Sequence, residues 1–124
     1  MQIAYDAVHL RLVEAVPEFA PVLAEHLEDQ EGELLQHVLF GDLTRFVVDA
    51  YERGDHELVS RCLDFLDEVL RNGDEMTQNL VGVSFVENVG PWDEAAQAFI
   101  ADWPDALGEE ARRQREWLPG EPER

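Results

Sequence analysis

The chain has 124 residues, the usual length of one domain, and 45% of them are hydrophobic, which argues against a disordered acidic chain. Its 28 acidic residues, set against nine arginines and no lysine, give a net charge of −19. A chain so negative lacks the cationic groups that bind nucleic acid or anionic membranes. The same charge attracts a basic protein partner, although it also serves simply to keep a protein in solution.

Cysteine use and hydropathy indicate a cytoplasmic protein. The single cysteine, Cys62, cannot form a disulfide within the chain. The segment after Met1 has no basic start followed by a long apolar run, so no secretion signal is predicted. No apolar stretch approaches the ~20 residues of a membrane-spanning helix. The abundance of Ala, Arg, Glu and Asp without Lys suggests a bacterial source.

Two helices are predicted in the first thirty residues. Apolar residues recur at helical spacing from Tyr5 to Val16, and Pro17 then ends the pattern because a helix interior does not accept proline. Pro21 suits the first turn of a second helix. The acidic stretch 25–33, which contains Gly32, indicates the end of that helix and a loop.

The middle of the chain predicts an antiparallel helix pair preceded by a short helical segment. Residues 34–40 fit one or two turns that end where Gly41 and Asp42 supply a break and a new N-cap. A helix then extends over 43–53 and stops at Gly54. Asp55 is placed to cap the next helix, 55–71, which has the clearest apolar stripe of the chain and ends at 72–73.

Three further helices complete the predicted fold. Residues 74–89 are almost uncharged after their first two positions and predict a buried central helix, because a lone strand would have no partner to pair with. Gly82 and Ser84 would allow another helix to approach it closely. Residues 92–103 follow the helical repeat throughout, and Pro104 opens a last helix.

The sequence therefore predicts an all-α protein, a compact bundle of about five to seven helices that are mostly antiparallel neighbours. We expect a single helical domain over residues 1–118 and a frayed C-terminal tail over 119–124.

Chemistry-bearing residues do not form a complete catalytic or cofactor motif. Glu25, His26 and His37 are the densest group of potential metal ligands, but their spacing does not match a helical zinc pattern with two histidines four residues apart. Cys62 lies on an apolar stripe, where a thiol ionises reluctantly. Glycine-rich phosphate loops and nucleophile elbows are absent from the sequence. We therefore predict no metal, no cofactor and no catalytic residue.

Two clusters of acidic residues are the remaining feature of the sequence that points to a function. The first lies at 25–33 and the second at 64–75. On the helix 55–71 the acids lie off the apolar stripe, so they are expected to share an outward face, where like charges repel each other. Carboxylates on such a face can accept charge-assisted contacts from arginine. The predicted partner-binding residues are Glu28, Asp29, Glu31, Asp64, Asp67 and Glu68.

Several short motifs resemble a family of small, acidic bacterial proteins to which no activity is assigned. They are Pro17-Glu18-Phe19, Glu25-His26, Glu33-Leu34-Leu35, Gly41 to Arg45, and Asn79-Leu80 together with Val83 to Asn88. The resemblance covers about the middle two-thirds of the chain and implies no site residues. In size, charge and helical content the chain is also similar to immunity proteins that neutralise secreted bacterial toxins, an analogy at the level of the class.

These features favour an acidic protein-binding module, most plausibly an immunity protein or antitoxin that occludes a basic toxin domain by steric and electrostatic means. One alternative is a small metal-dependent enzyme that uses Glu25, His26 and His37. Another is a structural subunit that associates with itself through exposed aromatic side chains. The binding hypothesis predicts a basic protein partner, no nucleic acid and no membrane.

Overall fold

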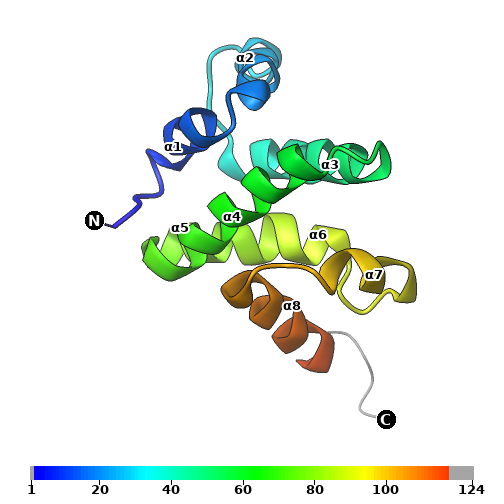
Figure 1. The fold of residues 1–124 in the computed structure, drawn as a ribbon. Helices are drawn as coiled ribbons and strands as arrows, with labels where there is room; N and C mark the ends of the chain where they lie inside the picture. The colour runs from blue at the N-terminus through cyan, green and yellow to red at the C-terminus, as the bar shows by residue number, and fades with distance from the viewer. Residues whose placement is uncertain (1, 118–124) are drawn as a thin grey trace.

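The computed structural model describes residues 2–117, and within them the regular structure is helical, apart from one isolated bridge between Ile3 and Gly73 (Figure 1). The prediction of an all-α fold is confirmed. The predicted tail, 119–124, lies outside the described residues. The elements in chain order are α1 (Val8–Ala15), the 3-10 turn η1 (Pro17–Phe19), α2 (Ala20–Asp29), α3 (Gln36–Glu52), α4 (His56–Asn72), α5 (Glu75–Val81), the π-helical turn η2 (Gly82–Val86), α6 (Glu87–Val89), the 3-10 turn η3 (Glu94–Ala96), α7 (Gln97–Ile100) and α8 (Asp105–Trp117).

The centre of the molecule is formed by α3, α4 and the α5–α6 segment, which cross one another, while α2 and α8 lie at opposite ends (Figure 1). The core contains three fully buried phenylalanines, Phe19, Phe40 and Phe85, supplied by η1, α3 and the π turn. By contrast, the only buried residue of α2 is His26. The helix α2 is therefore the least embedded of the long elements. No helix in the described range is long and apolar enough to cross a membrane.

The predicted break at Gly41 and Asp42 is wrong, because α3 runs through both residues without interruption. The buried side chains of α3 form one stripe that starts before the glycine and continues beyond it: Gln36, Leu39, Phe40, Leu43, Thr44, Val47 and Ala50. Packing of that stripe on the core outweighs the weak helix preference of a single glycine. Asp42 is paired with Arg45 one turn later and caps nothing.

The helix α4 begins and ends where the sequence predicts. The side chain of Asp55 accepts a hydrogen bond from the Leu58 N–H at 3.3 Å, which is the geometry of an N-cap. Gly73 ends α4 in an extended conformation, with φ −82° and ψ 160°. A Cβ at this position would lie 2.6 Å from the Val69 carbonyl oxygen, so close approach of the backbone is what requires glycine.

Residues 75–89 form one helical segment, which confirms the helix prediction over the strand alternative. It is not buried on all sides, since Met76 and Val83 are exposed. Its π turn is held by side chains of α3 and α8. The Thr44 hydroxyl donates to the Ser84 carbonyl at 2.9 Å, and the Gln114 amide donates to the Gly82 carbonyl at 2.9 Å. At Gly82 the near neighbours are side-chain ends from α8, since a Cβ there would lie 3.1 Å from Glu110 Oε2.

The regular helix predicted over residues 92–103 is shorter in the structure. Asp93 accepts a hydrogen bond from the Ala95 N–H at 3.1 Å and so starts a 3-10 turn, which leaves Trp92 outside the helix and exposed. Phe99 and Trp103 reach the core, where their rings meet edge to face with centroids 5.4 Å apart. The last helix follows Pro104 as predicted, with Leu107 and Ala111 buried.

Candidate functional site

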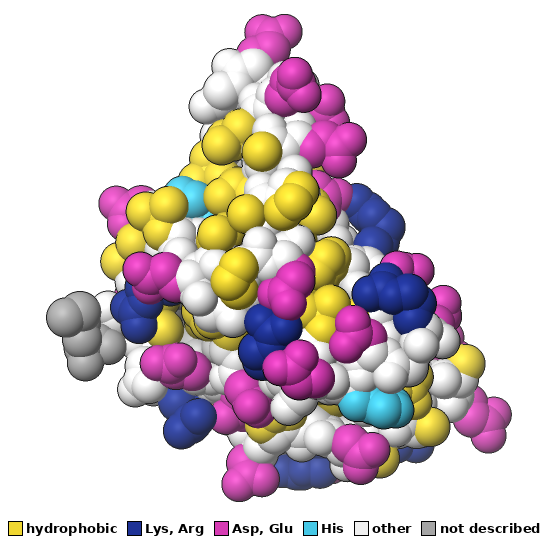
Figure 2. All heavy atoms as spheres, turned by 45° about the horizontal axis from the view of Figure 1, so that its top comes forward, with side chains coloured by type: hydrophobic (Ala, Val, Ile, Leu, Met, Phe, Trp, Pro, Cys, Tyr) yellow, Lys and Arg dark blue, Asp and Glu magenta, His cyan; other side chains and the backbone are white. Residues whose placement is uncertain are grey.

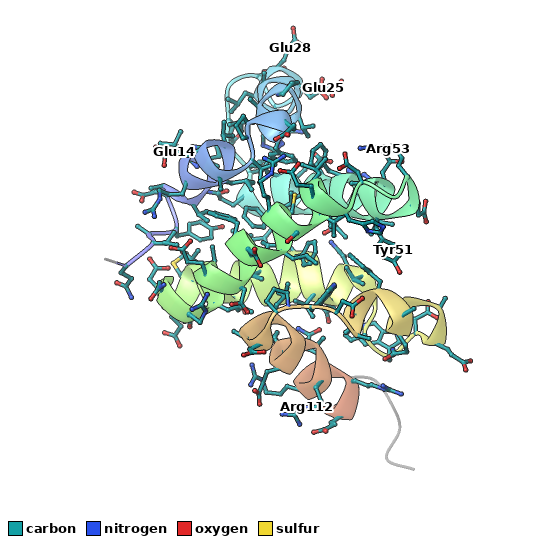
Figure 3. The ribbon with its side chains drawn as sticks, in the orientation of Figure 1. Glu14, Glu25, Glu28, Tyr51, Arg53 and Arg112 are labelled. Carbon is teal, nitrogen blue, oxygen red and sulfur yellow. The ribbon has the colours of Figure 1, made fainter. Side chains whose placement is uncertain are left out.

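Five exposed carboxylates gather at the outer end of α2 and in the turn after it, and we call this group the acidic tip: Glu25, Glu28, Asp29, Glu31 and Glu33. None of them forms an ion pair with another residue of the described chain. The acidic tip is visible at the projecting end of the molecule in Figure 2, with hydrophobic side chains gathered below it. Figure 3 shows Glu25 and Glu28 pointing away from the body of the protein in different directions.

A groove of about 690 Å³ lies between α2 and α3, beside the acidic tip. Its walls combine apolar side chains with carboxylates from both helices, and its lining residues are Val22, Glu25, His26, Asp29, Gln30, Val38, Asp42, Arg45, Phe46 and Asp49. The lining of the α2–α3 groove therefore contains four carboxylates and one arginine. The surroundings of this groove are strongly negative and its surface is partly apolar.

The two walls of the α2–α3 groove differ in how their carboxylates are balanced. On α3, Asp42 pairs with Arg45 and Asp49 pairs with Arg53. On α2, Glu25 and Asp29 have no cationic partner within residues 2–117. The unbalanced charge of the groove thus belongs to α2, where carboxylates three and four residues apart repel each other.

His26 forms the inner part of the α2–α3 groove and serves to hold the following loop. It is 3% exposed, and its Nε2 atom accepts a hydrogen bond from the Leu35 N–H at 3.1 Å. His37 contacts another part of the protein, with its Nδ1 atom 2.5 Å from the Ser84 hydroxyl. The structure does not join Glu25, His26 and His37 into one ligand set, and within the described range no three Asp, Glu, His or Cys side chains are placed to hold a metal ion.

The three acids predicted on the outward face of α4 lie in three different environments. Asp64 is exposed and lines a pocket between α4 and α7. Glu68 is half-buried and lines a shallow hollow beside Arg11. For Asp67 the predicted exposure is wrong, because this residue is only 5% exposed. The premise of a single acidic face on α4 therefore fails.

Asp67 fastens α8 to α4. Its Oδ1 atom accepts a hydrogen bond from the Leu107 N–H at 2.9 Å, and its Oδ2 atom accepts one from Arg71 Nε at 2.9 Å. Leu107 lies in the first turn of α8, where backbone N–H groups have no partner within the helix and where negative charge is favourable. Asp67 therefore caps α8 from a neighbouring helix, a structural role that does not leave its carboxylate free for a partner.

Another carboxylate is committed to a pair between distant elements. Glu18 in η1 and Arg61 in α4 form two parallel hydrogen bonds, one of them 2.9 Å long between Oε1 and Nη1. The hydrogen bond from Arg61 lowers the pKa of the Glu18 carboxyl to about 2. Beside Arg61, burial raises the pKa of the Cys62 thiol to about 12. Cys62 is therefore a core residue, as predicted, and a poor nucleophile.

The α2–α3 groove brings together residues that the sequence analysis did not connect. Of the predicted partner-binding residues only Asp29 lines it, while Glu28 points outward and Glu31 lies in the turn with a φ of 56°. The contribution of α3 was missed. Its signal is a second stripe on that helix, because Val38, Asp42, Arg45, Phe46 and Asp49 follow helical spacing on a face distinct from the core stripe.

Over residues 10–117 the chain matches the family described as "Domain of unknown function (DUF7674)", and it belongs to that family. No curated protein and no solved structure matches the chain significantly. Family membership thus identifies the domain and assigns it no activity.

Proposed function

We propose that this protein is an acidic protein-binding module that captures a basic segment of a partner protein in the α2–α3 groove. One observation carries the proposal: the carboxylates of α2 have no ion-pair partner within the described chain, and they border a groove that also offers apolar contact surface. Carboxylates placed in this way repel one another, and a cationic partner relieves that repulsion.

The mixed chemistry of the α2–α3 groove suits a basic amphipathic helix. Val22, Val38 and Phe46 supply the apolar contacts that an inserted leucine or isoleucine needs, while Glu25 and Asp29 can accept charge-assisted hydrogen bonds from flanking lysines or arginines. Recognition of a helix in a groove uses this combination of apolar anchors and charged rim. Val38 is 46% exposed and is therefore available to a partner.

The specific form that we propose is an immunity protein or antitoxin, acting in the cytoplasm, that covers a basic toxin domain. Such a protein needs a complementary surface and no catalytic group, because its mechanism is occlusion. The net charge of −19 supports this form, since a field of one sign speeds the encounter with an oppositely charged domain. The proposal assigns no enzymatic activity to the chain.

The test uses a synthetic helical peptide of leucine and lysine and an otherwise identical peptide of leucine and glutamate. We expect the wild-type protein to bind only the basic peptide. Replacing Glu25 with Gln and Asp29 with Asn should weaken that binding about tenfold, equivalent to ~1.4 kcal/mol. Calorimetric titration measures the affinity.

The matched control replaces Glu52 and Glu87 with Gln. Both side chains are exposed, neither lines the α2–α3 groove, and the pair removes the same amount of net charge. The control should keep wild-type affinity within about twofold. Equal loss of affinity in the two double variants would mean that only the overall charge matters, and binding of the acidic peptide by the wild type would refute the proposal.

A further inference from the structure

A second recess, which we call the α4–α7 pocket, shares no lining residue with the α2–α3 groove and has a volume of about 250 Å³. It is lined by Tyr51 from α3, by His56, Val59, Ser60, Leu63 and Asp64 from α4, and by Phe99, Asp102 and Pro104 from α7 and the segment after it. Pockets that enclose a small-molecule ligand are typically about 300–1,000 Å³. The α4–α7 pocket is therefore sized for one long side chain.

The aromatic rings of Tyr51 and Phe99 form one wall of this pocket. The rings of Tyr51 and Phe99 have centroids 4.4 Å apart and an angle of 38° between their planes. Phe99 is only 7% exposed and also makes an edge-to-face contact with Trp103. Tyr51 is 36% exposed, so part of its ring remains accessible. An accessible aromatic face with a rigid support is a favourable seat for a cation.

Two carboxylates, Asp64 and Asp102, also line the pocket and give it negative charge. Both are exposed, and neither forms an ion pair with a residue of the described chain. Arg53 is close in sequence, but it is bound to Asp49 and Asp55. Figure 3 shows Arg53 and Tyr51 on opposite sides of α3, with Tyr51 on the side of α7.

The absence of an arginine distinguishes the α4–α7 pocket from four other recesses of residues 2–117. Arg113, Arg45, Arg71 and Arg11 each line one of these four recesses. No arginine lines the α4–α7 pocket. Its aromatic wall and its carboxylates are thus arranged as a cation site in which residues 2–117 place no arginine, and the one basic side chain in the lining is His56.

We propose that the α4–α7 pocket receives the side chain of an arginine from a partner protein, with the guanidinium plane on Tyr51 and its N–H groups directed to Asp64 and Asp102. Arginine fits better than lysine, because its planar guanidinium stacks on aromatic rings and donates to carboxylates in a fork. This inference rests on the proposed function, since the arginine belongs to the basic partner. The arginine would then act as an anchor residue of the interface. Arginine is one of the residue types enriched among the few interface residues that carry most of the binding energy.

The experiment titrates the protein with N-acetyl-arginine amide and follows backbone and tyrosine-ring signals by NMR. We expect saturable shifts at Tyr51, Asp64, Phe99 and Asp102. The lysine amide should bind at least about threefold more weakly, and the uncharged citrulline amide should produce no saturable shift. The variants Asp64→Asn with Asp102→Asn, and separately Tyr51→Leu, should each lower the affinity for the arginine amide at least about fivefold.

The matched control is Asp6→Asn with Glu87→Gln, which removes the same charge from two exposed positions that line neither the α4–α7 pocket nor the α2–α3 groove, and it should leave the affinity for the arginine amide unchanged within about twofold. The backbone spectrum of each variant shows directly whether it remains folded. Shifts that map to α2, equal binding of citrulline amide, or equal losses in the two double variants would overturn the proposal.

The two proposals fail in distinguishable ways. If the arginine amide binds the α4–α7 pocket while the leucine–lysine peptide does not bind, the proposed α2–α3 groove is wrong and the pocket stands. If the peptide binds through Glu25 and Asp29 while the arginine amide shows no saturable shift, the pocket is wrong and the groove stands.

Discussion

The outer end of α2 and the middle of α4 both carry rows of carboxylates, and the two rows are used differently. On α2, Glu25 and Asp29 are exposed beside a groove and have no cationic partner within the described chain. On α4, Asp67 is buried and caps α8, whereas Asp64 lies at a pocket and Glu68 is half-buried. A carboxylate is therefore available for a partner only where it accepts no hydrogen bond from a backbone N–H and forms no ion pair with an arginine of the same protein.

The largest effect is expected where a carboxylate holds the fold. Replacing Asp67 with Ala leaves the Leu107 N–H without its acceptor and removes the charge beside the first turn of α8, so it should lower the free energy of unfolding by about 1–3 kcal/mol. Urea denaturation measures this change. The control, Glu28→Ala on exposed α2, should stay within about 0.5 kcal/mol of the wild type. Equal stabilities of the two variants would contradict the distinction between the two rows.

A smaller and pH-dependent effect is expected from the carboxylate that joins η1 to α4. The pKa of Glu18 falls to about 2 in the folded protein from an ordinary value of 4.5, so the unfolded protein binds this proton more readily. The pairing with Arg61 therefore stabilises the fold fully above pH 4.5, and its contribution disappears as the pH falls toward 2. Urea denaturation of the wild type and of Glu18→Gln across this range measures the contribution.

We expect Glu18→Gln to be less stable than the wild type at pH 7 and equally stable near pH 2. The effect should be smaller than that of Asp67→Ala, because the pair is exposed to solvent. A difference between wild type and variant that does not change with pH would show that the Glu18 carboxylate contributes through packing and not through its charge.

Elements with local signals could be predicted from the sequence. The start of α4 follows from Asp55, whose hydrogen-bond partner, Leu58, is three residues away, and the stripe of that helix repeats regularly. The continuation of α3 through Gly41 could not be predicted in this way. It depends on burial of side chains on both sides of the glycine against elements distant in sequence, and local preference is the weaker effect.

In the candidate site too, features with a local signal could be predicted from the sequence, and features that depend on contacts between distant residues could not. The acidic tip could be located from the sequence, because its five acidic residues lie within residues 25–33, a stretch that contains no arginine. The role of Asp67 could not, since its donor at Leu107 is forty residues away. The α4–α7 pocket was missed for the same reason: Tyr51, Asp64 and Phe99 come from three helices and meet only in the folded protein.

The measurement that most directly tests the central claim is the association rate of the leucine–lysine peptide as a function of salt concentration. Charges at the rim of a binding site act mainly on association, and salt screens them over about 10 Å at 0.1 M. We predict that the rate for the wild type falls steeply with salt and that Glu25→Gln with Asp29→Asn flattens this dependence more than Glu52→Gln with Glu87→Gln does. Identical salt dependence in the two double variants would contradict the claim that the carboxylates of α2 guide a basic partner into the α2–α3 groove.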